Sequence, residues 1–349
     1  MRKFDYSRLG EQSWDNKTLS FIANISQMQG RQEFFVKQKP QELEKLVEIA
    51  KIQSTEASNA IEGIRTTNTR LKQLVEERTK PKNRDEEEIA GYRDALAIIH
   101  ESFNDIPITP NYILLLHQIL FSHCSERSVG GKFKSVQNFI SSVDENGNAT
   151  NLFTPIDPLE TPFAIEKICN EFNEAIAYGK VNPLILIPIF IHDFLCIHPF
   201  LDGNGRMSRL LTTLLLYRSG FYVGKYISLE AKIAKHKELY YDALQDSQIG
   251  WHENKEDVMP FVRCMLSTIM SAYNDFEERI NIVSNNKSSI SMVKDAVNKQ
   301  IGKFRKVDIV SLCSSLSSSS IEKALKKLQD DGLIEKRGTG KATYYTRKN

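Results

Sequence analysis

The clearest pattern in the chain is an almost wholly apolar run over residues 184–197, LILIPIFIHDFLCI. Its length and composition predict a buried helix that Pro188 interrupts and that ends at His198. A second apolar stretch, RMSRLLTTLLLYRSG, begins soon afterwards and predicts another helix. Gly203 and Gly205 lie between the two and allow backbone angles that other residues avoid. We therefore expect two buried helices joined by a tight turn.

Helical spacing of apolar residues recurs through most of the chain, so the expected fold class is mainly α. Further helices are predicted over residues 41–50, 86–102, 111–122 and 163–177, and a short one over about 54–64 that ends at Gly63. Pro107 and Pro110 indicate a boundary before a central domain, and SNNKSS at 284–289 indicates a linker. The expected domains are an N-terminal helical region (1–105), a core (106–283) and a C-terminal domain (286–349).

The C-terminal segment differs from the rest in charge. Residues 286–349 carry 14 Lys and Arg against 6 Asp and Glu, a net charge of +8, whereas the remainder carries −6. Helices are predicted near 290–299, 306–314 and 321–330, and strands over 333–337 and 342–347 around a Gly-Thr-Gly turn. This order resembles a winged helix domain, whose cations could meet DNA phosphates: Lys323, Lys326, Lys327, Lys336, Arg337 and Lys341. Binding to a protein, or simple packing, stays open.

The turn between the two buried helices carries the most chemistry. Residues 198–209 read HPFLDGNGRMSR, which puts a base, a carboxylate and two arginines around one helix start. Unpaired N–H groups at a helix start bind anions. His198 can accept a proton at neutral pH, and Asp202 can hold Mg²⁺. Arg206 and Arg209 are three residues apart and would project from one face. This combination predicts transfer of a phosphate-bearing group.

Other interpretations of these residues are weaker. His192, Asp193 and His198 fit neither the HExxH nor the zinc-ribbon spacing, and Asp193 is better explained as a polar group satisfied within the fold. No GxGxxG or GxxxxGK(S/T) sequence occurs, which excludes Rossmann and P-loop nucleotide sites. Cys196 lies in the apolar run and is expected to be inert packing.

The string at 198–209 resembles the Fic family signature, HxFx(D/E)GNGRxxR, at every specified position. The resemblance implies transfer of AMP from ATP to a Ser, Thr or Tyr hydroxyl of a protein. His198 would deprotonate that hydroxyl, and Asp202 would bind Mg²⁺. The phosphates would be held by the turn and the helix start: Asn204 with the Gly203 and Gly205 amides for the α-phosphate, and Arg206 with Arg209 for the outer ones.

A second resemblance lies upstream, at Ser58-Asn59-Ala60-Ile61-Glu62-Gly63. It is similar to the (S/T)xxxE(G/N) inhibitory motif of the Fic class with an N-terminal inhibitory helix. On that resemblance Glu62 would pair with Arg209 and keep it from the γ-phosphate, and Ser58 would support the contact. In some relatives the same glutamate positions water to remove AMP from the target, and the sequence leaves that activity open.

A third resemblance covers residues 131–140, GKFKSVQNFI, followed by an Asn-Gly turn signal at 146–147 and a return strand at 151–154. It is similar to the Fic flap, GKFRxSQNWIGG, with Lys134 for Arg and Phe139 for Trp. An exposed strand edge there would hold a target segment by backbone pairing. The expected docking residues are Val136, Gln137, Asn138, Phe139 and Ile140, with an ordinary surface hairpin as the alternative. Tyr240 and Tyr241 resemble the tyrosines that line the adenine side, although core packing explains them almost as well.

The whole-chain quantities agree with a globular protein of 349 residues, 41% of them hydrophobic. The chain lacks a signal-peptide pattern and any run of about 18 apolar residues, so we expect a soluble, cytoplasmic protein without a membrane partner. Five cysteines without CxxC spacing argue against a disulfide framework.

The resulting hypothesis is an Mg²⁺- and ATP-dependent protein adenylyltransferase that modifies an unidentified target and itself and is inhibited by Glu62. The main alternative is a nucleotide-sensing transcriptional regulator, which the intact His198 disfavours because binding alone needs no base. A different phosphate-containing donor stays open, and so does a homodimer.

Overall fold

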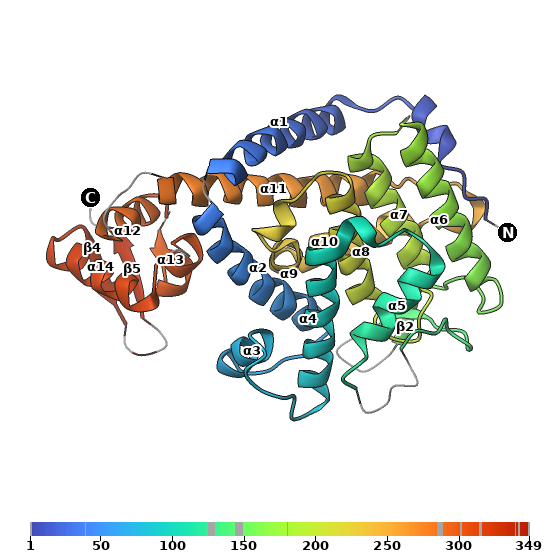
Figure 1. Ribbon diagram of the computed structural model, residues 1–349. Coiled ribbons are helices and arrows are strands. Elements are labelled where there is room, and N and C mark those ends of the chain that lie inside the picture. The colour runs from blue at the N-terminus through green and yellow to red at the C-terminus, as the bar shows by residue number, and fades with distance from the viewer. Residues whose placement is uncertain are drawn as a thin grey trace. The chain divides into compact units, whose positions relative to one another are not determined.

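The computed structural model describes residues 2–38, 40–124, 130–143, 149–179, 181–284, 289–300, 302–313, 316–338, 340 and 343–347. The chain is mainly α-helical with two small antiparallel sheets, so the expected fold class is confirmed (Figure 1). It forms two compact units, Met1–Gln29 with Ala50–Ala272, and Gly30–Ile49 with Tyr273–Asn349. The domain boundaries expected near residues 105 and 284 stay a prediction. Among the described residues no helix has both the length and the apolar character to cross a membrane.

The centre of the first unit is α7 (Pro183–Ile197), which is buried from its second residue to its last. It packs against α6 (Thr161–Tyr178) and α8 (Asn204–Arg218) (Figure 1). Contrary to expectation, Pro188 does not interrupt α7. An interior proline costs about 3 kcal/mol, and the burial of apolar side chains on every face of this helix outweighs that cost.

Two further helices complete the frame around the site. Helix α4 (Arg84–Ser102) packs against both α8 and α5 (Pro110–Leu120). A Cβ atom at Gly91 would collide with the carbonyl of Leu120, so α4 and α5 touch backbone to backbone there. This close contact fixes the end of α5, which lies beside the turn before α8.

Helix α2 (Pro40–Ile61) joins the two helices that the sequence predicts separately over 41–50 and about 54–64. The segment between them has no proline or glycine, so nothing breaks the helix. Gly63, at φ +84°, ends it as expected, since its N–H donates to Ala60 and the N–H of Ile64 donates to Asn59. The other helices of this part of the chain are η1 (Ser7–Glu11), α1 (Asn16–Gln38), α3 (Asn68–Val75), η2 (Phe103–Asp105), η3 (Val223–Lys225), α9 (Leu229–Lys235), α10 (Lys237–Gln248), η4 (Trp251–Glu253) and α11 (Met259–Ser284).

A two-stranded hairpin is formed by β1 (Ile140–Val143) and β2 (Ala149–Phe153). The pairs run from Ile140 opposite Phe153 to Val143 opposite Ala149, with a register shift after Ile140. The Asn-Gly turn expected at 146–147 lies outside the described residues. Residues 132–139, in contrast to the expected strand edge, form no strand. Their polar groups bond to the turn before α8 instead, as described below.

The second unit contains α12 (Ser289–Asn298), α13 (Lys306–Leu312) and α14 (Ser318–Asp330), with a sheet in the order β3 (Lys303–Phe304), β5 (Tyr344–Arg347), β4 (Ile334–Arg337). The three expected helices and two expected strands are present. Ser317 caps α14 by accepting from the N–H of Ser320, as the serine-rich turn suggests. The sequence missed β3, because two residues are too few to show alternation. Thr339 and Lys341, of the expected turn, lie outside the described residues.

Candidate active site

The turn between α7 and α8 begins at His198, which ends α7 in the left-handed conformation (φ 50°, ψ 62°). Its backbone N–H donates to the carbonyl of Phe194 at 3.0 Å. At the other end of the turn, the Asn204 side chain accepts from the N–H of Phe200 at 2.9 Å and donates to its carbonyl at 2.7 Å. The Asn204 amide therefore closes the turn on itself. Its backbone N–H, at the first residue of α8, stays available for the phosphate contact that the resemblance implies.

The turn is also held by His117 of α5, which the sequence analysis missed. Its ring is buried and stacks on Phe200 with centroids 3.6 Å apart. Nδ1 accepts from the N–H of Gly131 at 3.0 Å, so Nε2 carries the proton and donates to the carbonyl of Asp202 at 3.0 Å. Burial lowers the pKa of His117 to about 4, which keeps the ring neutral for this pair of bonds. The only sequence signal was one histidine beside the apolar run of α5.

A cavity of about 240 Å³ opens over the start of α8. Most of the residues expected at the site line it: Glu62, Ile140, His198, Asp202, Gly203, Asn204, Gly205, Arg209, Tyr240 and Tyr241. Small-molecule sites usually hold roughly 300–1,000 Å³. The cavity is therefore small for a nucleotide, and the position of Glu62, given below, explains why.

His198 presents one ring nitrogen to the cavity as a hydrogen-bond acceptor. Its Nδ1 lies 3.2 Å from the carbonyl of Leu195, which fixes the proton on Nδ1 and leaves Nε2 as the acceptor. Burial lowers the pKa of His198 to about 4, with nearby Lys134 adding to the shift. The ring is therefore neutral at physiological pH and can accept a proton.

Asp202 is half exposed at the entrance to the turn. Its Oδ1 accepts from the N–H of Gly203 at 2.6 Å and lies 3.4 Å from Nη2 of Arg206. Its Oδ2 has a more distant cation, Arg84 of α4, at 3.8 Å. The described residues contain no group of three or more acidic, His or Cys side chains that could hold a metal. A single carboxylate suits Mg²⁺, which keeps several waters and binds through one or two carboxylates plus phosphates.

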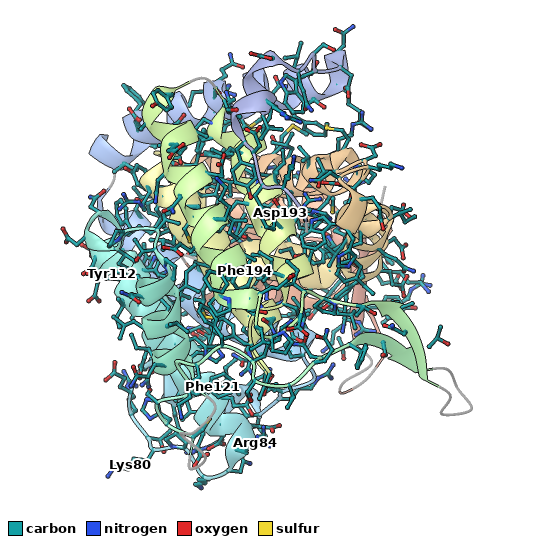
Figure 2. All side chains as sticks on the ribbon, turned by 90° about the vertical axis from the view of Figure 1, so that its right-hand side faces the viewer. Lys80, Arg84, Tyr112, Phe121, Asp193 and Phe194 are labelled. Carbon is teal, nitrogen blue, oxygen red and sulfur yellow. The ribbon has the colours of Figure 1, made fainter. Side chains whose placement is uncertain are left out.

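Arg206 does not point into the cavity, which corrects the expectation that both arginines grip phosphates. Its guanidinium is buried, pairs with Glu88 of α4 at 2.6 Å and lies 5.1 Å above the ring of Phe121. Arg84 and Phe121, labelled in Figure 2, come from α4 and the end of α5. Residues three apart on a helix diverge by about 60°, and α4 supplies the carboxylate that turns Arg206 away from Arg209.

Arg209 is the arginine that faces the cavity, and its partners come from the end of α2. Its Nη2 donates to Glu62 Oε1 at 2.7 Å and to the Ser58 carbonyl at 2.8 Å, and its Nε donates to Ser58 Oγ at 2.8 Å. A side chain at Gly205 would collide with Glu62 Oε1, so this carboxylate lies directly on the first turn of α8. It occupies the position where an anion would bind a helix start.

Behind Arg209 lies a buried network that the sequence did not reveal. The hydroxyl of Tyr92 donates to Glu230 Oε1 at 3.0 Å, and Ser228 donates to Glu230 Oε2 at 3.0 Å. Burial raises the pKa of Tyr92 well above its usual value, so the phenol stays protonated. These residues lie far apart in sequence and carry no motif, so only the fold identifies them.

Tyr240 and Tyr241 both line the cavity, on its α10 side. Tyr240 is buried and packs edge-on against Phe261 and Tyr241, with centroids 5.5 and 5.6 Å apart. Gln248, seven residues beyond Tyr241 on the same helix face, also lines the cavity. Its buried Nε2 has no hydrogen-bond partner among the described residues.

Asp193 is satisfied within the fold, as expected. Its carboxylate accepts from Trp251 Nε1 at 2.7 Å and from the hydroxyl of Tyr6 at 2.8 Å, and it pairs with Arg2 at 3.0 Å. Figure 2 labels Asp193 and its buried neighbour Phe194 on α7. Cys196 is also buried, and burial raises its pKa well above the usual value. All five cysteines are unpaired.

The five expected docking residues do not share one surface. Val136 and Phe139 are exposed, and Ile140 lines the cavity. Gln137 instead donates to the carbonyl of Pro155, and Asn138 donates to the carbonyls of His198 and Phe200. The two amides therefore hold the flap in place, and only the apolar residues stay available to a target.

Comparisons with known proteins agree with this geometry. A sequence model of the Fic/DOC family matches residues 107–216. A Fido domain-containing protein of Dictyostelium discoideum is 34% identical over 126 residues, which cover 35% of this chain and 83% of that protein. The Protein adenylyltransferase Fic of Nematostella vectensis is 28% identical over 218 residues, 59% of this chain, and the chain spans only 44% of that relative's length.

Solved structures share the fold. A Fic family protein from Desulfovibrio desulfuricans aligns with a TM-score of 0.62 and 19% identity over 97% of both chains. A Fic domain containing signaling protein from Bacteroides thetaiotaomicron aligns with a TM-score of 0.62 and 24% identity, covering 74% of this chain and 97% of that one. With the signature at 198–209, these matches lead to one conclusion: the chain belongs to the Fic/DOC family.

Proposed function

We propose that this protein transfers AMP from ATP to a Ser, Thr or Tyr hydroxyl of a protein, including its own. The observation that carries the proposal is the single cavity in which a neutral His198 and the start of α8 face each other. An anion site alone would serve to bind a nucleotide. A proton acceptor in the same cavity suits nucleotidyl transfer, because binding alone does not need one. Relatives named protein adenylyltransferase support the same activity.

In this reaction His198 accepts the proton of the target hydroxyl, whose oxygen then attacks the α-phosphorus of ATP. A bond forms between that oxygen and phosphorus, the bond to the bridging oxygen breaks, and pyrophosphate leaves. Backbone N–H groups at the start of α8 hold the charge on the α-phosphate. Asp202 would hold Mg²⁺, which neutralises phosphate charge when bound. The adenine of ATP would lie on the α10 side of the cavity, which is lined by Tyr240, Tyr241 and the side-chain amide of Gln248.

We also propose that the described conformation is the inhibited one. Glu62 uses the Arg209 guanidinium and covers Gly205, so an outer phosphate of ATP would meet a carboxylate of like charge. Release of Glu62 frees Arg209 for that phosphate. Arg206 acts differently: it holds Asp202 and α4 in place and is a positioning residue.

The test is incubation of the purified chain with Mg²⁺ and ATP, followed by intact mass and peptide mass spectrometry, for the wild type and for Glu62→Gly. An AMP adduct on the chain that increases in Glu62→Gly supports both proposals. Adducts from another nucleotide but not from ATP would assign a different donor. ATP binding without any adduct, in both proteins and with a lysate added, would favour a nucleotide-sensing regulator.

A second proposal concerns the second unit, which we propose to be a winged helix that contacts duplex DNA. A groove of about 760 Å³ between α13, α14 and the sheet is lined by Arg305, Lys306, Lys326 and Lys336. The charge is partly compensated there, since Lys306 pairs with Glu322 at 2.6 Å and Lys327 with Asp331 at 3.0 Å. Lys323 and Lys326 have no ion-pair partner among the described residues, which makes them the cations best placed to meet phosphates.

A further inference from the structure

Two residues of the flap, Lys134 and Asn138, hold four consecutive carbonyl groups of the catalytic turn, three through their side chains and one through a backbone N–H. The carbonyl of Ile197 accepts from Lys134 Nζ at 3.0 Å, and that of Pro199 accepts from the backbone N–H of Lys134 at 2.8 Å. The carbonyls of His198 and Phe200 both accept from Asn138 Nδ2, at 3.2 and 3.0 Å. No carbonyl from the end of α7 to Phe200 is left to water alone.

The two residues also brace each other. Lys134 Nζ donates to Asn138 Oδ1 at 2.9 Å, which orients the amide so that its nitrogen faces the turn. Lys134 is only 3% exposed, and burial lowers its pKa to about 8. Its ammonium lies at the C-terminal end of α7, where a positive charge is stabilised by the helix dipole.

The turn needs such support because of the backbone at His198. A left-handed conformation is unfavourable for a residue with a Cβ atom, and His198 adopts it at φ 50°. That conformation reverses the chain so that the imidazole lines the cavity. If the carbonyl groups on either side were free, the turn could relax and the ring would move away from the target hydroxyl.

We propose that Lys134 and Asn138 are positioning residues that hold His198 in its reactive place. The proposal rests on the proposed function, because it assigns to His198 the role of base. The strand β1 begins two residues after Asn138, so the hairpin and the base belong to one connected structure. A displacement of about 1 Å at a reacting group can cost on the order of 100-fold in rate.

The experiment uses the full chain carrying Glu62→Gly as the parent and adds Asn138→Asp. An aspartate keeps the size and the contact with Lys134 but loses both donors to the turn. We expect auto-modification to fall on the order of 100-fold while ATP affinity, measured by calorimetry, stays within about two-fold, because the α8 start and Arg209 are untouched. Lys134→Arg, which keeps donors at this place, is expected to retain most of the rate.

The matched control is Asn173→Asp, which removes a similar bond from Nδ2 to the carbonyl of Ile108 (2.8 Å), away from the cavity. An independent measurement is the NMR titration of the His198 ring, assigned with His198→Ala. Its pKa should rise from about 4 toward its ordinary value in Asn138→Ala, which adds no charge beside the ring, because the loosened ring gains water, and it should stay unchanged in Asn173→Ala.

Equal losses in the two Asn variants, a parallel loss of ATP affinity, or an unchanged rate with Asn138→Asp would each overturn the positioning role. If the Glu62→Gly parent transfers no AMP at all, the proposed function fails instead. The NMR titration then still decides the positioning role, since a ring whose pKa is unaffected by the uncharged Asn138→Ala contradicts it.

Discussion

The two sides of the first turn of α8 present the same pair of groups with different consequences. On one side Arg209 is paired with Glu62, whose side chain is 32% exposed at the end of α2. On the other, Arg206 is paired with Glu88, whose side chain is 5% exposed near the N-terminal end of α4. A carboxylate at a helix end beside a cavity can move away without breaking other contacts, whereas Glu88 is enclosed. The first pair can therefore act as a switch, and the second holds the frame.

The largest effect on activity is expected for His198, the proposed base, which lies beside both pairs in the turn before α8. In the Glu62→Gly chain, His198→Ala should lower auto-modification by about 10² to 10⁴-fold, because a general base typically contributes that much. ATP affinity should stay the same, since the imidazole acts on the hydroxyl and not on the phosphates. Rates come from labelled ATP and affinities from calorimetry. An unchanged rate would remove His198 from the mechanism.

The frame pair should respond mainly in stability. Glu88→Gln removes the nearer of the two carboxylates beside the buried Arg206, which we expect to lower the free energy of unfolding by on the order of 3 kcal/mol. Urea unfolding monitored by circular dichroism measures it. Glu62→Gln is the matched control and should cost clearly less, since water in the cavity can solvate Arg209. Equal losses would mean that the two pairs are equally structural.

The switch pair should respond mainly in activity. Glu62→Gly is expected to raise auto-modification by roughly 5 to 150-fold, the range of a 1–3 kcal/mol coupling, because it frees Arg209 for an outer phosphate. Adding Arg209→Ala should abolish the gain. A Glu62→Gly chain that is no more active than the wild type would make Glu62 a structural residue only. An AMP adduct that the wild type removes and Glu62→Gly does not would point to an additional hydrolytic role.

Acid should lower the free energy of unfolding through four histidines of the first unit. Burial lowers the pKa of His100 to about 3, and of His117, His192 and His198 to about 4. The unfolded chain binds protons at these rings below about pH 6.5, so the free energy of unfolding is intact above that pH and falls as the pH drops toward 4. Each ring contributes about 1.4 kcal/mol per pH unit inside that window. Urea unfolding at pH 7 and pH 5 measures the slope, and a flat profile would contradict the burial of neutral rings.

The sequence predicted the Glu62–Arg209 side well because each residue belongs to a short pattern of fixed spacing. It was wrong about Arg206, since the spacing of two arginines gives their angle on a helix but not the carboxylate that α4 brings opposite one of them. His117, Lys134 and Asn138 have partners in distant segments, so no local pattern reveals that they hold the turn. Apolar periodicity located α7 and α8, and it could not show that α2 is continuous because two helical patterns in sequence look the same whether joined or separate.

The smallest effect is expected in the second unit, for the cations of α14. Replacing condensed counterions makes DNA affinity fall with salt, with a log–log slope of about −0.9 for each phosphate contacted. Lys323 lies three residues before Lys326 and four before Lys327, so all three can follow one side of the helix. Changing all three to Glu should weaken binding to generic duplex DNA and lower that slope, whereas auto-modification should stay unchanged because none of them lies in the active-site unit. Fluorescence anisotropy at 50 and 200 mM salt measures both quantities.

A sharper test compares the single variants. Lys327 already pairs with Asp331, so Lys323→Glu should lower DNA affinity more than Lys327→Glu does. No duplex binding by the wild-type chain at low salt would make the second unit a packing or protein-docking domain.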